Sequence, residues 1–285
     1  MKFLKFSLLT FFFFCACTPA QYSGGSRIAS IQIKGSDTIV NLIQAWTEKN
    51  PVFFNVSVTG GGSGTGFASL INDTCDIAMS SRLMEEKEKI LAKNRNVNIV
   101  GFNIGLDGLA VLVNKNNPVN ELTLDQLRDI FMAKITNWKE VGGEDRKIVI
   151  LSRESNSGTH VFFKERVLRR NNKNARDEFA VQSLMLPSSQ TIYYEVYQNP
   201  NALGYVGMGF VNDKVKAVSI AINADSKYVF PTPENVINGT YLISRPLYLY
   251  TNGNPQGVVK MFIDYALSDA GQKIVLETDF VPFKI

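Results

Sequence analysis

The same succession of local patterns occurs three times along this chain and restricts the folds that it can adopt. A strand-like run is followed by a loop of small polar residues and then by the start of a helix. The three loops are residues 35–38, 60–66 and 152–159. Backbone N–H groups at a helix N-terminus lack partners and favour negative charge. Each loop therefore predicts a place for an anion, and the three together predict a fold that brings the loops to one site.

Strand and helix signals also alternate along the rest of the chain. Ile39, Leu42, Ile43 and Trp46 recur at helical spacing directly after the first loop. Further strands are expected at residues 53–58, 76–79, 97–102, 109–113, 148–151, 202–207, 215–222 and 246–250. This alternation is typical of the α/β class. It is compatible with one doubly wound sheet and with two α/β lobes.

The N-terminus has the pattern of an export signal. Lys2 and Lys5 precede an apolar run at residues 6–14. That run is too short to span a bilayer and reads as the core of a secretory signal. We therefore expect an extracytoplasmic protein.

A cysteine follows a small residue at the end of this run, which resembles a lipoprotein processing site. We expect residues 1–16 to be a signal peptide and Cys17 to be the lipidated first residue of the mature chain. Residues 17–27 would then form a lipidated tether to the membrane. The alternatives are lipidation at Cys15 and ordinary signal cleavage near Ala20.

Composition excludes several classes of function. The net charge of +4 falls to +2 without Lys2 and Lys5, which is too weak to indicate nucleic-acid binding. The basic tract at 164–170 contains an acidic residue and reads as a solvated helix face rather than a phosphate-backbone patch. Cys75 and His160 alone cannot build a metal site. We expect no metal and no cofactor.

Several phrases, in order along the chain, resemble the phosphate-binding protein of bacterial ABC phosphate importers. They lie at residues 107–114, 122–131, 135–143, 153–159, 204–207, 244–248 and 268–272. The resemblance implies a two-lobed, periplasmic-binding-protein-like (type II) α/β fold with the ligand in the interlobe cleft. Residues 28–113 plus 246–285 would form lobe one, and residues 114–245 would form lobe two.

The resemblance also implies which residues hold the anion. Donors from both lobes are expected to replace the water of the bound ion. They are Arg153, Ser157, Gly158 and Thr159 from lobe two, and Ser36, Thr38 and Ser63 from lobe one, with Thr65 as a possible extra donor. Arg153 offers a planar donor fork that suits a tetrahedral oxyanion. The structural alternatives are helix caps for Ser36 and Ser157, tight turns for the glycines, and an ion pair for Arg153.

One part of the expected site departs from the family. Better-known members carry a carboxylate after a serine in the turn after the third strand, whereas residues 80–82 here read Ser-Ser-Arg. A carboxylate that accepts the proton of phosphate would repel fully ionised sulfate. Asp107 is our first choice for this acceptor and Asp37 the second, with turn or cap roles as the alternatives. Arg82 is expected to be a second guanidinium on the anion or a solvated residue at a helix start, and Ser81 is a further candidate.

The resemblance implies a lipoprotein that captures inorganic phosphate and delivers it to an ABC import permease. We expect a monomer, held to the membrane by its lipid anchor and facing the periplasm or the cell surface. We do not expect an enzyme, because residues 60–66 lack the end of a P-loop and neither Ser63 nor Ser157 lies in a Gly-x-Ser-x-Gly motif. The alternatives are a sulfate or molybdate receptor, a phosphate-ester hydrolase on the same fold, and an adhesin or signalling module.

Overall fold

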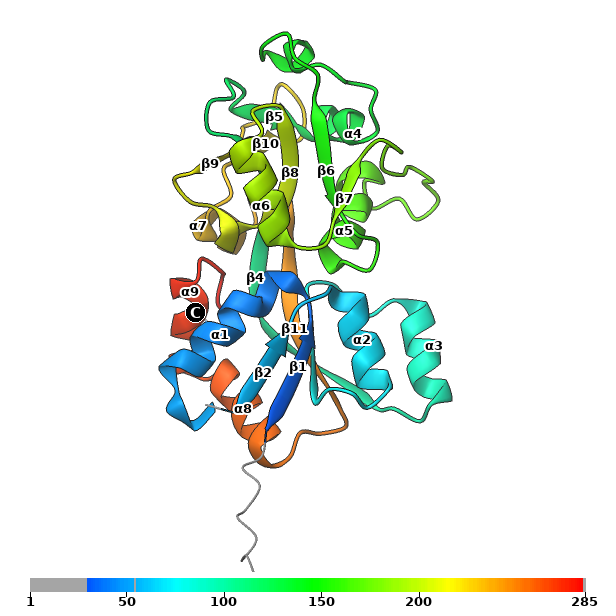
Figure 1. Ribbon diagram of the computed structural model, residues 1–285, viewed down its shortest axis with the longest axis vertical. Coiled ribbons are helices and arrows are strands. Elements are labelled where there is room, and N and C mark those ends of the chain that lie inside the picture. Colours follow the sequence, from blue (N-terminus) through cyan, green and yellow to red (C-terminus); the bar gives the residue numbers. More distant parts are fainter. Residues whose placement is uncertain (1–29, 54, 284–285) are drawn as a thin grey trace, which may run out of the picture.

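The computed structural model describes residues 30–53 and 55–283. The expected signal peptide, Cys17 and the tether lie outside the described residues. Figure 1 shows an elongated molecule in which two halves, here called the lower and upper halves, are stacked along the long axis. Two strands, β4 (Ile99–Asn114) and β11 (Ser244–Asn252), run from one half into the other.

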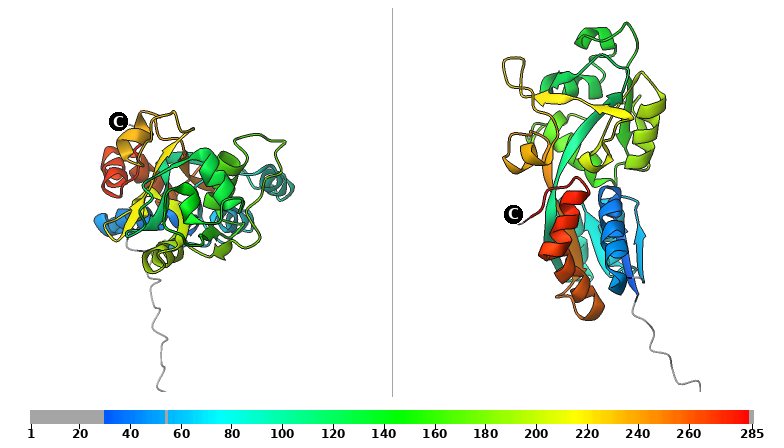
Figure 2. Two further views of the ribbon diagram at one scale, coloured as in Figure 1. Left: turned by 90° about the horizontal axis from the view of Figure 1, so that it is seen from above. Right: turned by 90° about the vertical axis from the view of Figure 1, so that its left-hand side faces the viewer.

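The lower half contains three parallel strands covered by helices. These strands are β1 (Ile31–Gly35), β2 (Val56–Thr59) and β3 (Ile77–Ser80). The helices are α1 (Val40–Lys49), α2 (Ser63–Ile71), α3 (Glu86–Asn94), α8 (Gly257–Leu267) and α9 (Asp269–Glu277), with the 3₁₀ turns η1 (Asp37–Ile39) and η2 (Pro51–Phe53). The second view in Figure 2 shows that α8 and α9, at the end of the chain, pack beside α1. The first and last parts of the chain therefore build one half together.

The upper half contains the remaining elements. Its strands are β5 (Glu121–Thr123), β6 (Val149–Arg153), β7 (Leu184–Leu186), β8 (Ala202–Gly207), β9 (Val215–Ala217) and β10 (Ser219–Ala221). Its helices are α4 (Leu124–Phe131), α5 (Gly158–Phe163), α6 (Ser189–Gln198) and α7 (Pro233–Ile237). The shorter turns are η3 (Trp138–Val141), η4 (Lys164–Leu168, a π-helix) and η5 (Met208–Phe210).

One sheet passes through both halves in the order β2-β1-β3-β11-β4-β8-β6-β7, with β9 also paired to β4. Strand β4 pairs with β11 from Ile99 to Gly108 and with β8 from Leu109 to Val113. The sequence predicted two separate strands here, and the structure has one. Gly105 lies at an irregularity in the pairing of β4 with β11, and a Cβ at this position would lie 2.6 Å from the carbonyl oxygen of Val281.

The apolar core follows the predicted patterns. Ile39, Leu42, Ile43 and Trp46 are all fully buried in the lower half, which confirms the helical face expected after the first loop. In the upper half, Thr123 caps α4 through its hydroxyl. Within the described ranges, no helix combines the length and the apolar character that a membrane crossing needs.

Replacing Trp46 by alanine should destabilise the protein strongly. The indole is fully buried, and its Nε1 donates to the carbonyl oxygen of Gly271, 2.8 Å away, which joins α1 to α9. We expect the free energy of unfolding in urea to fall by about 3–5 kcal/mol. Met261→Ala on α8, where the side chain is 51% exposed, is the control and should change it by less than about 0.5 kcal/mol. A loss similar to that of the control would contradict this role of Trp46.

Candidate anion-binding site

The three polar loops lie where the halves meet. Each loop follows the carboxyl end of a parallel strand, namely β1, β2 or β6, and leads into a helix. Figure 1 shows α2 of the lower half and α5 of the upper half on either side of this boundary. Asn156 joins two of the loops, because its carbonyl oxygen accepts from Gly64 N at 3.0 Å and its Nδ2 donates to Gly61 O at 2.9 Å. Gly62 N donates to Gly35 O at 2.9 Å, which joins the first loop to the second. The expected convergence of the three loops is therefore present.

Ser36 and Thr38 of the first loop are both buried at this boundary. Ser36 Oγ donates to Ser81 Oγ over 2.9 Å and caps no helix with its side chain. Thr38 Oγ1 lies 3.2 Å from Thr159 Oγ1 of the upper half. Both hydroxyls therefore face other candidate residues rather than solvent.

Ser63, Ser81 and Gly158 form a tight cluster across the boundary. Ser63 Oγ is fully buried and accepts from Ser81 N at 3.1 Å. A Cβ at position 158 would lie 2.3 Å from Ser63 Oγ and 2.8 Å from Ser81 Oγ. Only glycine fits at this position with the two halves in this arrangement. Thr65, in contrast, is exposed and donates to Gly61 O at the rim of the loop.

Ser157 has the capping role that the sequence offered as its structural alternative. Its Oγ accepts from Thr159 N and His160 N at the start of α5. The hydroxyl hydrogen stays available as a donor, because capping uses only the oxygen. A cap and a ligand role are therefore compatible at this residue.

Arg153 is almost completely buried and forms an ion pair between the halves. Its Nη2 donates to Asp37 Oδ2 at 2.6 Å, and Asp37 Oδ1 accepts from Gly61 N at 3.1 Å. Its other acceptors are the carbonyl oxygens of Leu186 and Pro187 and the hydroxyl of Ser189. Since a guanidinium has five N–H donors, these contacts leave one N–H of Arg153, on Nη1, for a ligand.

Asp107 is paired with a residue that the sequence analysis missed as a site residue, Arg245. The two side chains lie opposite each other on β4 and β11 and are 0% exposed. Asp107 Oδ2 accepts from Arg245 Nε at 3.0 Å and from Nη2 at 2.8 Å, and Oδ1 accepts from Met208 N at 3.0 Å. Burial raises the pKa of Asp107, and the Arg245 guanidinium opposes that shift. An arginine within an apolar strand run was the signal that could have identified Arg245.

Arg82 contacts an acidic side chain of its own half. Its Nη1 and Nη2 donate to the two carboxylate oxygens of Glu88, at 2.8 and 2.7 Å. The guanidinium also lies over the ring of Phe67, 5.2 Å from its centre. The two hydrogen bonds to Glu88 connect Arg82 to the first turn of α3. A direct contact of Arg82 with an anion stays a prediction.

The only histidine of the chain, His160, lies behind the anion loops. Its Nδ1 is 3.4 Å from Ser152 Oγ, and both side chains are buried. Ser152 Oγ also lies 2.7 Å from the hydroxyl of Tyr205. The described ranges contain no group of three or more His, Cys, Asp and Glu residues that could hold a metal ion. The Ser152–His160 contact therefore links the end of β6 to the start of α5, on either side of the Arg153 loop.

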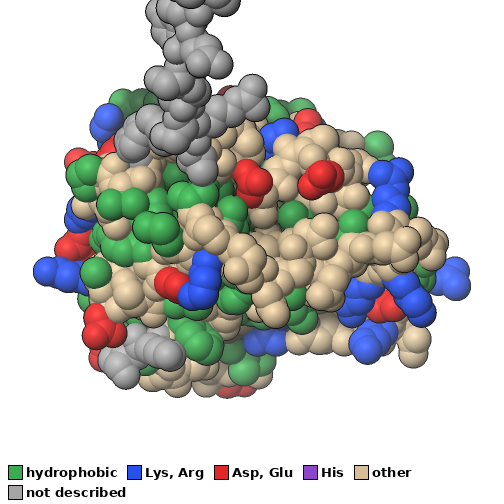
Figure 3. Space-filling model, turned by 90° about the horizontal axis from the view of Figure 1, so that it is seen from below, with side chains coloured by type: hydrophobic (Ala, Val, Ile, Leu, Met, Phe, Trp, Pro, Cys, Tyr) green, Lys and Arg blue, Asp and Glu red, His purple; other side chains and the backbone are tan. Residues whose placement is uncertain are grey.

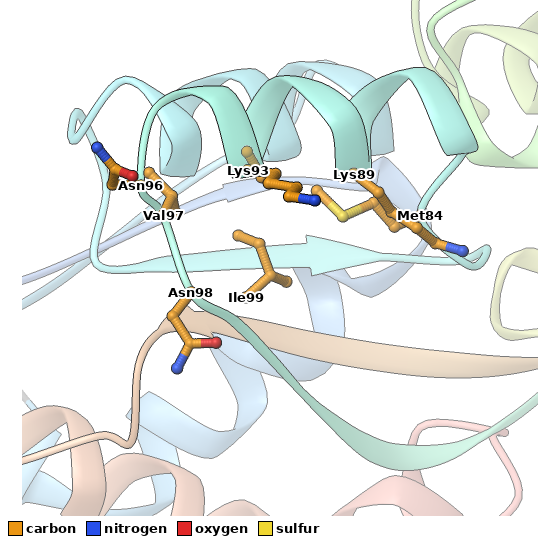
Figure 4. Close-up of a pocket in the computed structure, with 8 residues that line it drawn as sticks. Met84, Lys89, Lys93, Asn96, Val97, Asn98 and Ile99 are labelled. Atoms are coloured by element: carbon orange, nitrogen blue, oxygen red, sulfur yellow. The ribbon is translucent and has the colours of Figure 1, made fainter.

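One pocket lies away from the three loops, and a second lies beside one of them. The pocket in Figure 4 lies between α3 and the start of β4 and is lined by residues such as Met84, Lys89 and Ile99. No residue of the three loops lines it. A second pocket, between Glu85 of the lower half and Lys164 of the upper half, includes only Ser155 of the loops. The candidate site is thus defined by converging donors at the boundary.

The buried environment of His160 makes a testable prediction. Burial, with a smaller effect of Lys164, lowers the pKa of His160 to about 4. Because the unfolded chain binds this proton at a pKa of about 6.5, stability should fall as the pH is lowered from about 6.5 towards 4. The single histidine resonance should titrate near pH 4 in the folded protein and near pH 6.5 in urea by NMR. A folded-state midpoint near 6.5 would contradict the burial of His160.

The comparisons with known proteins support the same family as the sequence. Residues 20–270 match a family model described as the PBP superfamily domain. The phosphate-binding protein PstS of Bacillus subtilis is 34% identical, over 89% of this chain and 80% of the relative. PstS of Pseudomonas aeruginosa is 29% identical, over 94% and 88%.

Solved structures agree with these relatives. A substrate-binding protein of a phosphate ABC transporter from Clostridium perfringens, solved with bound phosphate, has a TM-score of 0.79 and 35% identity, over 90% of this chain and all of that one. An ABC-type phosphate transport receptor from Vibrio cholerae has a TM-score of 0.66 and 32% identity, over 88% and 99%. These matches confirm the resemblance and the periplasmic-binding-protein-like α/β fold. The chain belongs to the bacterial phosphate-binding protein (PstS) family of the PBP superfamily.

Proposed function

We propose that this protein is an extracytoplasmic substrate-binding protein that captures inorganic phosphate and delivers it to an ABC import permease. The observation that carries the proposal is the meeting of three helix-start loops, from both halves, around buried hydroxyls and the Arg153 guanidinium. The names of the relatives and the phosphate in the Clostridium perfringens structure support the choice of anion. The Vibrio cholerae relative, a phosphate transport receptor, supports binding rather than catalysis as the proposed role.

The proposed ligand set takes donors from both halves. A dehydrated oxyanion needs fixed donors in place of its water, because an unpaired buried charge is very costly. Ser36, Thr38 and Ser63 would donate from the lower half. Arg153, Ser157, Thr159 and the backbone N–H of Gly158, at the start of α5, would donate from the upper half. A site made from both halves is complete only when they are closed on each other.

The mechanism we propose is a shift between open and closed arrangements of two lobes. Residues 28–113 plus 246–285 would move as lobe one and residues 114–245 as lobe two, with β4 and β11 as the connections. Contacts between the halves, such as Arg153 with Asp37, belong to the closed arrangement. An anion that contacts both lobes binds this arrangement better and so increases its population.

The contacts favour Asp37 over Asp107 as the acceptor for the phosphate proton. Asp107 Oδ2 already accepts two N–H groups of Arg245, and its side chain is fully buried. Asp37 Oδ2 accepts one N–H of Arg153, which leaves a lone pair on that oxygen for a P–OH group. This reverses the order that the sequence suggested for the two residues.

The membrane attachment is a separate part of the proposal. Cys17 would carry the lipid, residues 17–27 would form the tether, and the protein would be a monomer on the periplasmic or outer side of a membrane. Figure 3, which views the molecule from below, shows acidic and basic side chains interspersed on this face. Mixed charges on this face do not favour nucleic acid as a partner.

Calorimetric titration should show tight binding of phosphate and none of sulfate. The chain from residue 18 onward, which includes the whole described fold, would be stripped of bound anion and titrated with each ion at pH 7. Phosphate carries a proton for the acceptor, whereas sulfate does not. Equal binding of both ions would favour a general oxyanion receptor, and binding of neither would reject the proposed function.

A second titration, with variants of Asp37 and Asp107, distinguishes the two candidates for the acceptor of the phosphate proton. Asp37→Asn should lower phosphate affinity by about tenfold or more, since it weakens a charge-assisted hydrogen bond, and should allow sulfate to bind. Asp107→Asn is the matched comparison and should leave sulfate excluded. Sulfate binding gained in Asp107→Asn alone would restore Asp107 as the acceptor.

A further inference from the structure

Arg245 is the buried guanidinium with the most unused donors at the boundary. Its Nη1 is buried and has no hydrogen-bond partner among the described residues. Arg153, in contrast, has four of its five N–H donors engaged by Asp37, Ser189 and two carbonyl oxygens. Buried donors normally have partners, and an arginine with a free terminal nitrogen at 0% side-chain exposure requires an explanation.

The planar shape of the guanidinium fixes where the unused donor points. Nε and one hydrogen of Nη2 form the edge that faces Asp107. The second hydrogen of Nη2 points out of the end of the group, towards Thr38 Oγ1 and Thr159 Oγ1, each 3.1 Å away. One hydrogen of Nη1 lies parallel to it at that same end. The unused donor is therefore directed to the side on which the candidate anion residues lie.

The two threonine hydroxyls leave a second unused donor at the same place. Thr38 Oγ1 and Thr159 Oγ1 are 3.2 Å apart, and both are within reach of Arg245 Nη2. When one hydroxyl donates to the other, the hydrogen of the second remains. Hydroxyl and guanidinium donors side by side, buried and without an acceptor, are the arrangement that an oxyanion satisfies.

Asp107 holds Arg245 in this position. The residues are direct partners across the β4–β11 ladder, and the carboxylate accepts two N–H groups of the guanidinium. The guanidinium also lies over the ring of Phe162 on α5, 5.7 Å from its centre. These contacts leave the group little freedom to turn away, so that its free end is oriented before an anion arrives.

We propose that Arg245 is a second arginine that contacts the bound anion, through Nη1, and that Asp107 is the counterion that positions it. The inference rests on the proposed phosphate-binding function and deepens it. Arg245 lies on a strand that connects the halves and touches hydroxyls of both, so its full set of contacts forms only when the halves close. It also supplies the second guanidinium that the sequence analysis had sought at Arg82.

The test compares phosphate titrations of variants in the chain from residue 18 onward. The double variant Arg245→Met/Asp107→Asn removes the guanidinium without leaving a buried unpaired charge, an exchange that proteins often tolerate. We expect a thermal midpoint close to that of the wild type and a loss of phosphate affinity of about tenfold to hundredfold. Arg128→Met/Asp177→Asn, which removes a half-buried pair elsewhere in the upper half, is the matched control and should bind as the wild type does.

A second variant separates a ligand role from a structural one. Arg245→Lys keeps a positive charge and a donor but loses the two-point contact with Asp107. If Arg245 contacts the anion, this variant should bind phosphate more tightly than Arg245→Met even where it is no more stable. If the phosphate affinities of the two variants follow their thermal stabilities and not the charge at position 245, the inference is overturned.

The outcomes also distinguish this inference from the proposed function. A wild-type protein that does not bind phosphate would reject the function itself. A wild-type protein that binds, together with folded Arg245 variants that bind within about twofold of it, would leave the function intact and reject the role of Arg245. If the double variant fails to fold, the comparison of Arg245→Lys with the wild type decides.

Discussion

The buried pair of Asp107 and Arg245 is the interaction on which the rest of the site depends. The pair joins β4 to β11 where both strands pass between the halves. A charge pair without solvent stabilises a protein only when its geometry is good and its remaining donors are satisfied. Here the carboxylate accepts three N–H groups, while the guanidinium extends to Thr38 and Thr159. The two connecting strands and the candidate anion-binding residues therefore form one connected network.

The three loops reach this network because the parallel strands that precede them all end at the boundary between the halves. The strands β1 and β2 of the lower half and β6 of the upper half end at the boundary, and each continues into a helix start. The halves touch through backbone and small side chains, with Gly158 against Ser63 and Gly64 against Asn156. Such close contact brings short hydroxyl side chains from both halves within about one hydrogen bond of each other, as for Thr38 and Thr159.

Sequence patterns predicted the local parts of this design better than the contacts between distant residues. The loops and the buried face of α1 follow from neighbouring residues, and the structure contains both. Two strands, at residues 97–102 and 109–113, were expected where β4 is continuous, because its pairing with the distant strand β11 cannot be seen from neighbouring residues. Arg245 was missed as a site residue for the same reason, since its partners Asp107, Thr38 and Thr159 are all far away in the sequence.

A crystal structure of the protein with phosphate would show whether both halves contact the same ion. We predict a single phosphate at the boundary, within hydrogen-bond distance of donors from both halves, with Arg153 and Arg245 each contacting an oxygen atom. The Asp107–Arg245 pair should be intact in that complex. A phosphate bound to one half alone, or at a place remote from the three loops, would contradict the account.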